Sequence, residues 1–111
     1  MKVIDVSKAE EKSNPSAIFE GHVTVRTLVD QNIRLALVKF SPGARTKLHH
    51  HTHEQVLYIT EGEGVLATEK EEKLVKPGMI VFVPAGEKHW HGSKGKTFAH
   101  VSITTPGETV F

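Results

Sequence analysis

The stretch that decides the fold covers residues 42–62 and reads PGARTKLHHHTHEQVLYITEG. It contains four histidines, and two more, His89 and His91, form a second cluster further along the chain. Neutral imidazole is the commonest metal ligand among side chains. Because side chains alternate between the two faces of a strand, His49 and His51 can bind one ion from a single strand. His89 can then complete a metal site from a second strand.

Two other interpretations of the histidines compete with a metal site. Four histidines within residues 49–53 can be solvated loop residues, or a metal-rich tract of low specificity. A purification tag would lie at a terminus, whereas both clusters lie well inside the chain. Turn sequences rich in glycine and proline surround the clusters and can bring them together in space, which favours a folded site.

Length and charge restrict the classes of function. The 111 residues, 12.3 kDa in mass, are expected to form a single domain over residues 1–111. A net charge of +1 with interspersed signs predicts no nucleic-acid partner. No apolar run approaches the ~18 residues of a membrane span, and residues 1–12 are too charged for a signal peptide. We therefore expect a cytoplasmic protein that acts on a small molecule.

The chain contains no cysteine, which excludes disulfides, thiolate chemistry and cysteine-rich zinc sites. A metal bound by this chain would have nitrogen and oxygen ligands. Such ligands suit manganese, iron, nickel or zinc better than softer ions.

Short strands separated by turns account for most of the chain. One helical turn is predicted over residues 8–12, capped by Ser7 and Glu10. Strands are predicted over 22–29, 33–40, 47–51, 55–60, 65–68, 73–75, 79–83, 88–92 and 97–105. Short strands at this spacing predict an all-β sandwich or barrel, and a double-sheet jelly roll fits a metal-binding barrel of this kind.

Two motifs with fixed spacing make this prediction more specific. The first has Gly43, then five residues, His49, one residue, His51, three residues, Gln55, six residues and Gly62. The second has Gly78, then five residues, Pro84, one residue, Gly86, two residues and His89. Both closely resemble the two signature motifs of the cupin superfamily. The resemblance implies a double-stranded β-helix, the jelly-roll cupin barrel, with the motifs within residues 42–104.

By position, the cupin resemblance implies four metal ligands: His49, His51, Gln55 and His89. Most cupins have glutamate where this chain has Gln55. Two neighbours compete with it: Glu54 is a carboxylate, and His53 shares strand parity with His51. The spacing to the glycine at the end of the motif favours Gln55, as does its shared parity with the apolar residues that follow it.

Three further segments narrow the resemblance. They are PGART at 42–46, GEKHWHG at 86–92 and FAHVSI at 98–103. Together they resemble the manganese-dependent cupin hydroxynitrile lyases and the cupins associated with carboxymuconolactone decarboxylase. That resemblance implies one divalent metal ion, manganese first, and His100 as the catalytic general base. From the residues alone, His100 faces either the cavity or the outer surface of its strand.

The remaining site residues are assigned by parity. His91 shares parity with the second-motif ligand and is expected to contact a substrate or orient a ligand. Thr46 is expected to offer a hydroxyl at the entrance, and Leu57 should line the interior beside the substrate. His50 has the opposite parity and should face away from the ion, whereas Trp90 should pack outside the metal site.

Three functions remain open. Neutral ligands leave the full charge on a divalent ion, which favours Lewis-acid chemistry of lyase or isomerase type on a small hydroxy-carbonyl or cyanohydrin-like compound. The alternatives are a metal-dependent dioxygenase of the quercetinase type and a non-catalytic small-molecule-binding module. The early strand over residues 22–29 has two partly apolar faces, so we also expect a homodimer that exchanges an N-terminal strand or packs sheet on sheet.

Overall fold

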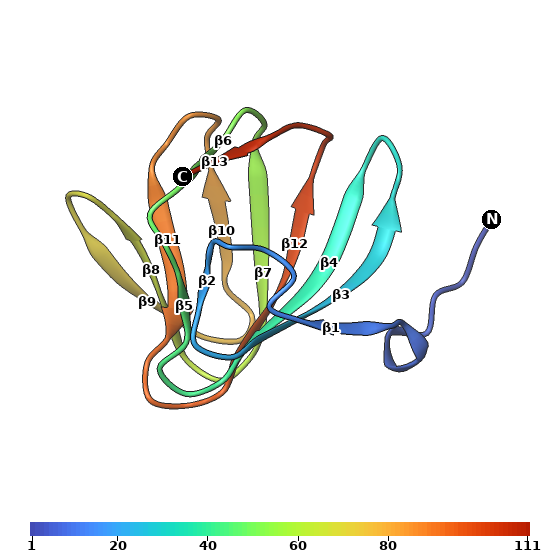
Figure 1. Ribbon diagram of the computed structural model, residues 1–111, viewed down its shortest axis with the longest axis horizontal. Coiled ribbons are helices and arrows are strands. Elements are labelled where there is room, and N and C mark those ends of the chain that lie inside the picture. The colour runs from blue at the N-terminus through green and yellow to red at the C-terminus, as the bar shows by residue number, and fades with distance from the viewer.

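The computed structural model describes all 111 residues, and antiparallel strands make up most of it (Figure 1). A single 3₁₀ turn, η1 (Val6–Lys8), precedes the strands. The strands are β1 (Glu11–Ser13), β2 (Phe19–Glu20), β3 (Val23–Asp30), β4 (Arg34–Phe40), β5 (Arg45–Thr46), β6 (His50–His51), β7 (Gln55–Glu61), β8 (Gly64–Thr68), β9 (Glu72–Val75), β10 (Ile80–Val83), β11 (His89–Ser93), β12 (Phe98–Thr104) and β13 (Thr109–Val110).

Two sheets form the barrel. The larger has six strands in the order β1-β3-β4-β12-β7-β10, and the smaller has five in the order β2-β5-β11-β8-β9. A two-stranded sheet of β6 and β13 lies across one end of the barrel (Figure 1). Neighbours in these sheets come from distant parts of the sequence, as in β12 between β4 and β7. The structure confirms the all-β jelly-roll barrel expected from the sequence.

Strand β7 shows how the sequence pattern specifies the barrel interior. Gln55, Leu57 and Ile59 are buried, whereas Tyr58 between them is 44% exposed. This alternation confirms the parity used to orient Gln55 inward. Leu57 and Ile59 belong to a continuous apolar core of Val23, Val38, Phe40, Ala44, Leu57, Ile59, Leu66, Val75 and Phe98.

The glycine that ends the first motif has a clear steric role. Gly62 adopts a φ of 70°, and a Cβ atom at this position would lie 1.7 Å from the backbone oxygen of Thr97. Only glycine fits a turn with both the left-handed backbone and this close approach. The turn connects β7, in the six-stranded sheet, to β8, in the five-stranded sheet. It therefore sets the point at which the chain passes from one sheet to the other.

Two local predictions were wrong, and two short strands were missed. Asp5 caps a 3₁₀ turn at Val6–Lys8, and residues 11–13 form β1, so there is no helical turn over residues 8–12. The strand expected over 47–51 is only the pair His50–His51, because Arg45–Thr46 forms a separate strand before it. The two-residue strands β2 and β13 have no apolar alternation of their own, and for this reason the sequence pattern did not identify them.

No helix in the structure has the length and apolar character needed to cross a membrane.

The outer face of the six-stranded sheet is apolar across four adjacent strands. Tyr58, Ile80 and Phe82 on it are 44%, 66% and 56% exposed. Cross-strand pairing places side chains of β4, β7, β10 and β12 next to one another on this face: Leu35, Leu37, Val56, Tyr58, Ile80, Phe82, Val101 and Ile103. Contiguous apolar surface of this kind is typical of an interaction site.

We expect two copies of the chain to pack through this face, the sheet-on-sheet form of the predicted homodimer. A lysine at position 82 would place a charge in that contact, so Phe82→Lys should convert a dimer into a monomer at micromolar concentration. Leu74→Lys is the control, because Leu74 is equally exposed, at 63%, but lies on β9 in the other sheet. Sedimentation velocity measures the masses, and a monomeric wild type would contradict the expectation.

Candidate metal centre

The two motifs meet at a short bridge between His49 and His89. The backbone N–H of each residue donates to the backbone oxygen of the other, and both N···O distances are 2.9 Å. This pairing brings the two imidazole rings to 4.4 Å between centroids. His51, on β6, lies 4.9 Å from His49 and 5.3 Å from His89 by the same measure. Three imidazoles therefore converge inside the barrel.

Each of these three rings is held by its Nδ1 atom. Nδ1 of His49 lies 2.7 Å from the backbone oxygen of Lys47, and Nδ1 of His89 lies 2.8 Å from that of Glu87. Nδ1 of His51 lies 2.8 Å from the hydroxyl of Thr109. A carbonyl oxygen only accepts, so Nδ1 of His49 and of His89 carries the proton. Their Nε2 atoms then have a lone pair available for a metal.

Four buried polar atoms in this cluster have no hydrogen-bond partner. They are Nε2 of His49, of His51 and of His89, together with Oε1 of Gln55. The amide of Gln55 is oriented by its nitrogen, which donates to Oγ of Ser102 at 2.9 Å. A buried acceptor left unpaired costs ~1–3 kcal/mol, and a native structure usually has a reason for it. A cluster of this many unpaired atoms fits a cation, which Nε2 of His51 can bind in the tautomer with the proton on Nδ1.

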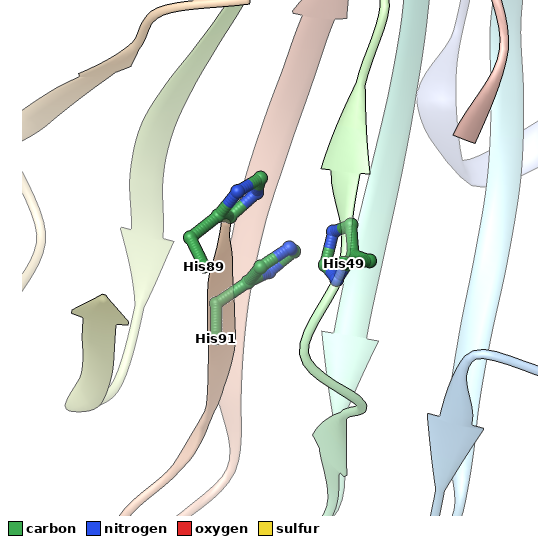
Figure 2. Close-up of side chains that lie close together, drawn as sticks. All are labelled: His49, His89 and His91. Carbon is green, nitrogen blue, oxygen red and sulfur yellow. The ribbon is translucent and has the colours of Figure 1, made fainter. Parts of the chain in front are cut away.

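His91 lies in the same cluster. Figure 2 shows His89 and His91 projecting from β11 toward His49, and candidate ligand atoms of these three residues lie within 4.8 Å of one another. This triad can hold a metal ion. His91 also has a second partner, because its Nδ1 lies 2.9 Å from Nε2 of His100. His91 therefore connects the cluster to His100, which lies in the barrel interior and is fully buried.

A cavity of about 250 Å³ lies beside the imidazoles. Its polar wall contains His49, His51, Gln55, His91, His100 and Ser102, and its apolar wall includes Ile18, Phe19, Val25, Ala36 and Val38. It therefore suits a small compound with one apolar and one polar side.

The other residues singled out in the sequence lie elsewhere. Thr46 is completely buried, and its hydroxyl accepts the backbone N–H of His91, so it does not lie at an entrance as expected. Leu57 faces the interior but packs in the apolar core and does not line the cavity. Of the two competitors of Gln55, Glu54 is exposed. His53 is half-buried and stacks on His51 with 4.8 Å between ring centroids.

The two neighbours expected to face away from the ion fit that expectation. Trp90 is on the opposite side of β11 from the flanking histidines, and the guanidinium of Arg45 lies 3.8 Å from the centre of its ring. His50 is half-buried and lines a second cavity, outside the one that Gln55 and His51 line, together with Leu48, His49 and Phe111.

Burial keeps the clustered histidines neutral. It lowers the pKa of His49 to about 4 and that of His51 to about 3. Burial also lowers the pKa of His89, places the pKa of His91 well below its usual value, and lowers the pKa of His100 to about 3. Imidazoles must be neutral to bind a metal. The neutral imidazoles can therefore bind a cation near neutral pH.

A family model of the cupin domain matches residues 36–104, which include the whole cluster. The chain belongs to the cupin family. The (R)-mandelonitrile lyase of Granulicella tundricola is 34% identical to it over 111 aligned residues, which cover 93% of this chain and 83% of the lyase. The crystal structure of a cupin-like protein from Thermotoga maritima matches with 30% identity and a TM-score of 0.85, covering 96% of this chain and 88% of that one.

A dioxygenase is also among the relatives of this cupin. The acireductone dioxygenase of Bacillus licheniformis is 30% identical over 80% of this chain, although the chain spans only 51% of that enzyme. The family resemblance read from the two motifs is thus confirmed, and the relatives include both a lyase and a dioxygenase.

Sequence reasoning missed two parts of this cupin's site. The segment between β1 and β2 supplies Pro15, Ser16 and Ile18 to the cavity wall, and Thr109 on β13 contacts His51. Both segments lie outside the motifs and contain few apolar residues in alternation. The one sequence signal for Thr109 is its position in a short β-branched pair, Thr109–Val110, at the C-terminus.

The lowered pKa values predict how the metal-free cupin responds to acid. Unfolded histidines bind protons below about pH 6.5, whereas the folded imidazoles stay neutral until the pH approaches 3 to 4. The unfolded state thus binds more protons in this window, and the folded state loses stability as pH falls. Each such histidine contributes up to about 1.4 kcal/mol per pH unit.

Urea unfolding in the presence of a chelator measures this effect. The free energy of unfolding should fall by at least about 1 kcal/mol between pH 7.5 and pH 5.5. A value that stays constant or rises over this interval would contradict the burial of neutral imidazoles.

Proposed function

We propose that this cupin is a metal-dependent enzyme of lyase type that cleaves a small hydroxy compound. The observation that carries the proposal is the set of four buried acceptor atoms, three imidazole nitrogens and one amide oxygen, without partners in the protein. The 34% identity to a mandelonitrile lyase along most of the chain supports the reaction class.

The proposed ligands are His49, His51, Gln55 and His89. His91 is the competitor for the place of His51, because its ligand atoms lie close enough to those of the other two imidazoles. Its Nδ1 is already paired with Nε2 of His100, and its Nε2 is not one of the fully buried nitrogens that lack a partner. We therefore assign His91 a role in proton transfer together with His100, and not in binding the ion.

All four proposed ligands are electrically neutral, and manganese is the divalent ion we propose for them. When bound, such an ion supplies Lewis-acid chemistry, which lowers the pKa of a nearby hydroxyl and polarises a carbonyl. Without an anionic ligand its positive charge is not compensated by the protein. This set of ligands favours proton-transfer chemistry over oxygen activation, since an anionic ligand stabilises the higher oxidation states that oxygen chemistry uses.

His100 is the proposed general base. Its Nδ1 is buried and has no hydrogen-bond partner, whereas its Nε2 is paired with Nδ1 of His91. When Nε2 of His100 donates in this pair, Nδ1 has a lone pair that can accept a proton from a substrate hydroxyl. The imidazolium formed keeps its hydrogen bond to His91. Because burial lowers the pKa of His100 to about 3, the ring returns the proton readily.

A cyanohydrin illustrates the proposed bond changes. Nδ1 of His100 takes the hydroxyl proton, the O–H electron pair becomes the second bond of the carbonyl, and the bond to the nitrile carbon breaks. The cyanide leaves with the electron pair of that carbon–carbon bond and receives the proton from His100, so the products are an aldehyde and hydrogen cyanide. The apolar wall, which includes Ile18, Val25 and Val38, suits the hydrocarbon part of such a substrate.

Replacement of single histidines tests the ligand set. His51→Ala and His89→Ala should abolish stoichiometric manganese binding, because each removes one of the unpaired nitrogens. His91→Ala should keep the ion, and His50→Ala is the matched control from the neighbouring position on β6. Isothermal titration calorimetry measures the stoichiometry. If His91→Ala loses the ion and His51→Ala keeps it, the triad of His49, His89 and His91 is the metal site instead.

Mandelonitrile is the probe for the activity. The manganese-loaded protein should release benzaldehyde from it without oxygen, and His100→Ala should lower the rate by about 10²–10⁴ while its manganese content is unchanged. His22→Ala, in which an exposed histidine on the barrel surface is replaced, is the control. An unchanged rate in His100→Ala would contradict the assigned base.

Oxygen dependence separates the remaining functions. Turnover that requires oxygen would indicate a dioxygenase. Bound metal without turnover of any hydroxy-carbonyl or cyanohydrin compound would indicate a binding module.

A further inference from the structure

The C-terminal residues 107–110, here called the C-terminal strap, lie across the first metal-binding motif (Figure 1). In this strap β13 pairs with β6, and Thr109 lies directly opposite His51. The backbone N–H of Thr52 donates to the oxygen of Glu108 at 3.0 Å, and the N–H of Glu108 donates to the hydroxyl of Thr52 at 2.9 Å. The strap is therefore attached to the motif along its whole length.

His51 is oriented differently from the other two imidazoles of the converging group. His49 and His89 each contact the carbonyl of a residue two positions earlier in the chain, so the local backbone orients them. His51 contacts the side chain of Thr109, which is 58 positions away. Its orientation thus depends on the strap.

The chemistry of the partner also differs. A carbonyl oxygen fixes the proton on Nδ1, whereas a threonine hydroxyl can donate or accept. His51 can therefore exist as either neutral tautomer while it keeps its contact with Thr109. Only the tautomer with the proton on Nδ1, donating to Thr109, leaves Nε2 free to bind an ion.

We propose that Thr109 is a positioning residue for the metal centre, and that the C-terminal strap is an integral part of the site. This inference rests on the proposed function, since it takes His51 as a ligand. Thr109 directs Nε2 of His51 toward the ion, and its hydroxyl accepts a hydrogen bond from the Nδ1–H of His51 once the ion is bound. Loss of a hydrogen bond to a metal-binding histidine typically lowers metal affinity about 10–100-fold.

Three substitutions in the full-length chain test the proposal. Thr109→Val keeps the shape of the side chain and fills the place of the hydroxyl with a methyl group. Thr109→Ser restores a hydroxyl. Thr52→Val is the matched control, because it removes a side-chain hydrogen bond that holds the same strap but contacts no imidazole.

Manganese affinity is the first measurement, by calorimetry in competition with a chelator. Thr109→Val should bind manganese about 10–100-fold more weakly than the wild type. Thr109→Ser and Thr52→Val should lie within about threefold of the wild type, which is below the range expected for the lost contact. Equal losses in Thr52→Val and Thr109→Val would overturn the proposal, because the strap would then act only by covering the motif.

Proton NMR of the zinc-loaded protein is the second measurement. The Nδ1–H signal of His51 should be protected from exchange in the wild type and in Thr109→Ser, and it should be lost in Thr109→Val. The Nδ1–H signals of His49 and His89 serve as internal controls and should persist in all variants. An unchanged His51 signal together with an unchanged manganese affinity in Thr109→Val would overturn the role of Thr109 but leave the proposed function standing. A wild-type protein that binds no metal would instead refute the proposed function.

Discussion

The reciprocal backbone pairing of His49 and His89 is the contact on which the site depends. It joins two motifs that are far apart in the sequence and brings their imidazoles to 4.4 Å between centroids. The remaining positions follow from the registers of the strands beside it. β7 pairs with β12, which brings the amide nitrogen of Gln55 within hydrogen-bonding distance of Ser102. A slip of one residue in β7 would turn Gln55 to the outer face of the sheet.

The interior of the barrel is unusually polar for so small a core. Four buried histidines line one cavity and a fifth, His89, lies beside them, and burial lowers the pKa of each of the five. Their unpaired nitrogens are costly to bury, at ~1–3 kcal/mol each. Apolar side chains in these places would stabilise the barrel more. This cost is explained if the nitrogens bind a metal ion and transfer a proton.

The sequence was informative where side chains alternate and where glycines have a steric role. The alternation of β7 predicted that Gln55, Leu57 and Ile59 face the interior, and the motif spacing ended correctly at Gly62, whose backbone tolerates no side chain. The C-terminal strap and the segment before β2 were not predicted, because both are held by long-range backbone pairing rather than by apolar alternation. The buried hydroxyl of Thr46 was misassigned for a related reason, since its partner is the backbone of a distant strand.

We propose that His51 and Gln55, rather than His91, complete the metal site with His49 and His89. Anomalous diffraction at the manganese absorption edge, from crystals grown with manganese, tests this most directly. We expect one strong peak within bonding distance of Nε2 of His49, of His51 and of His89 and of Oε1 of Gln55. A peak bound by His91 and remote from Gln55 would contradict it.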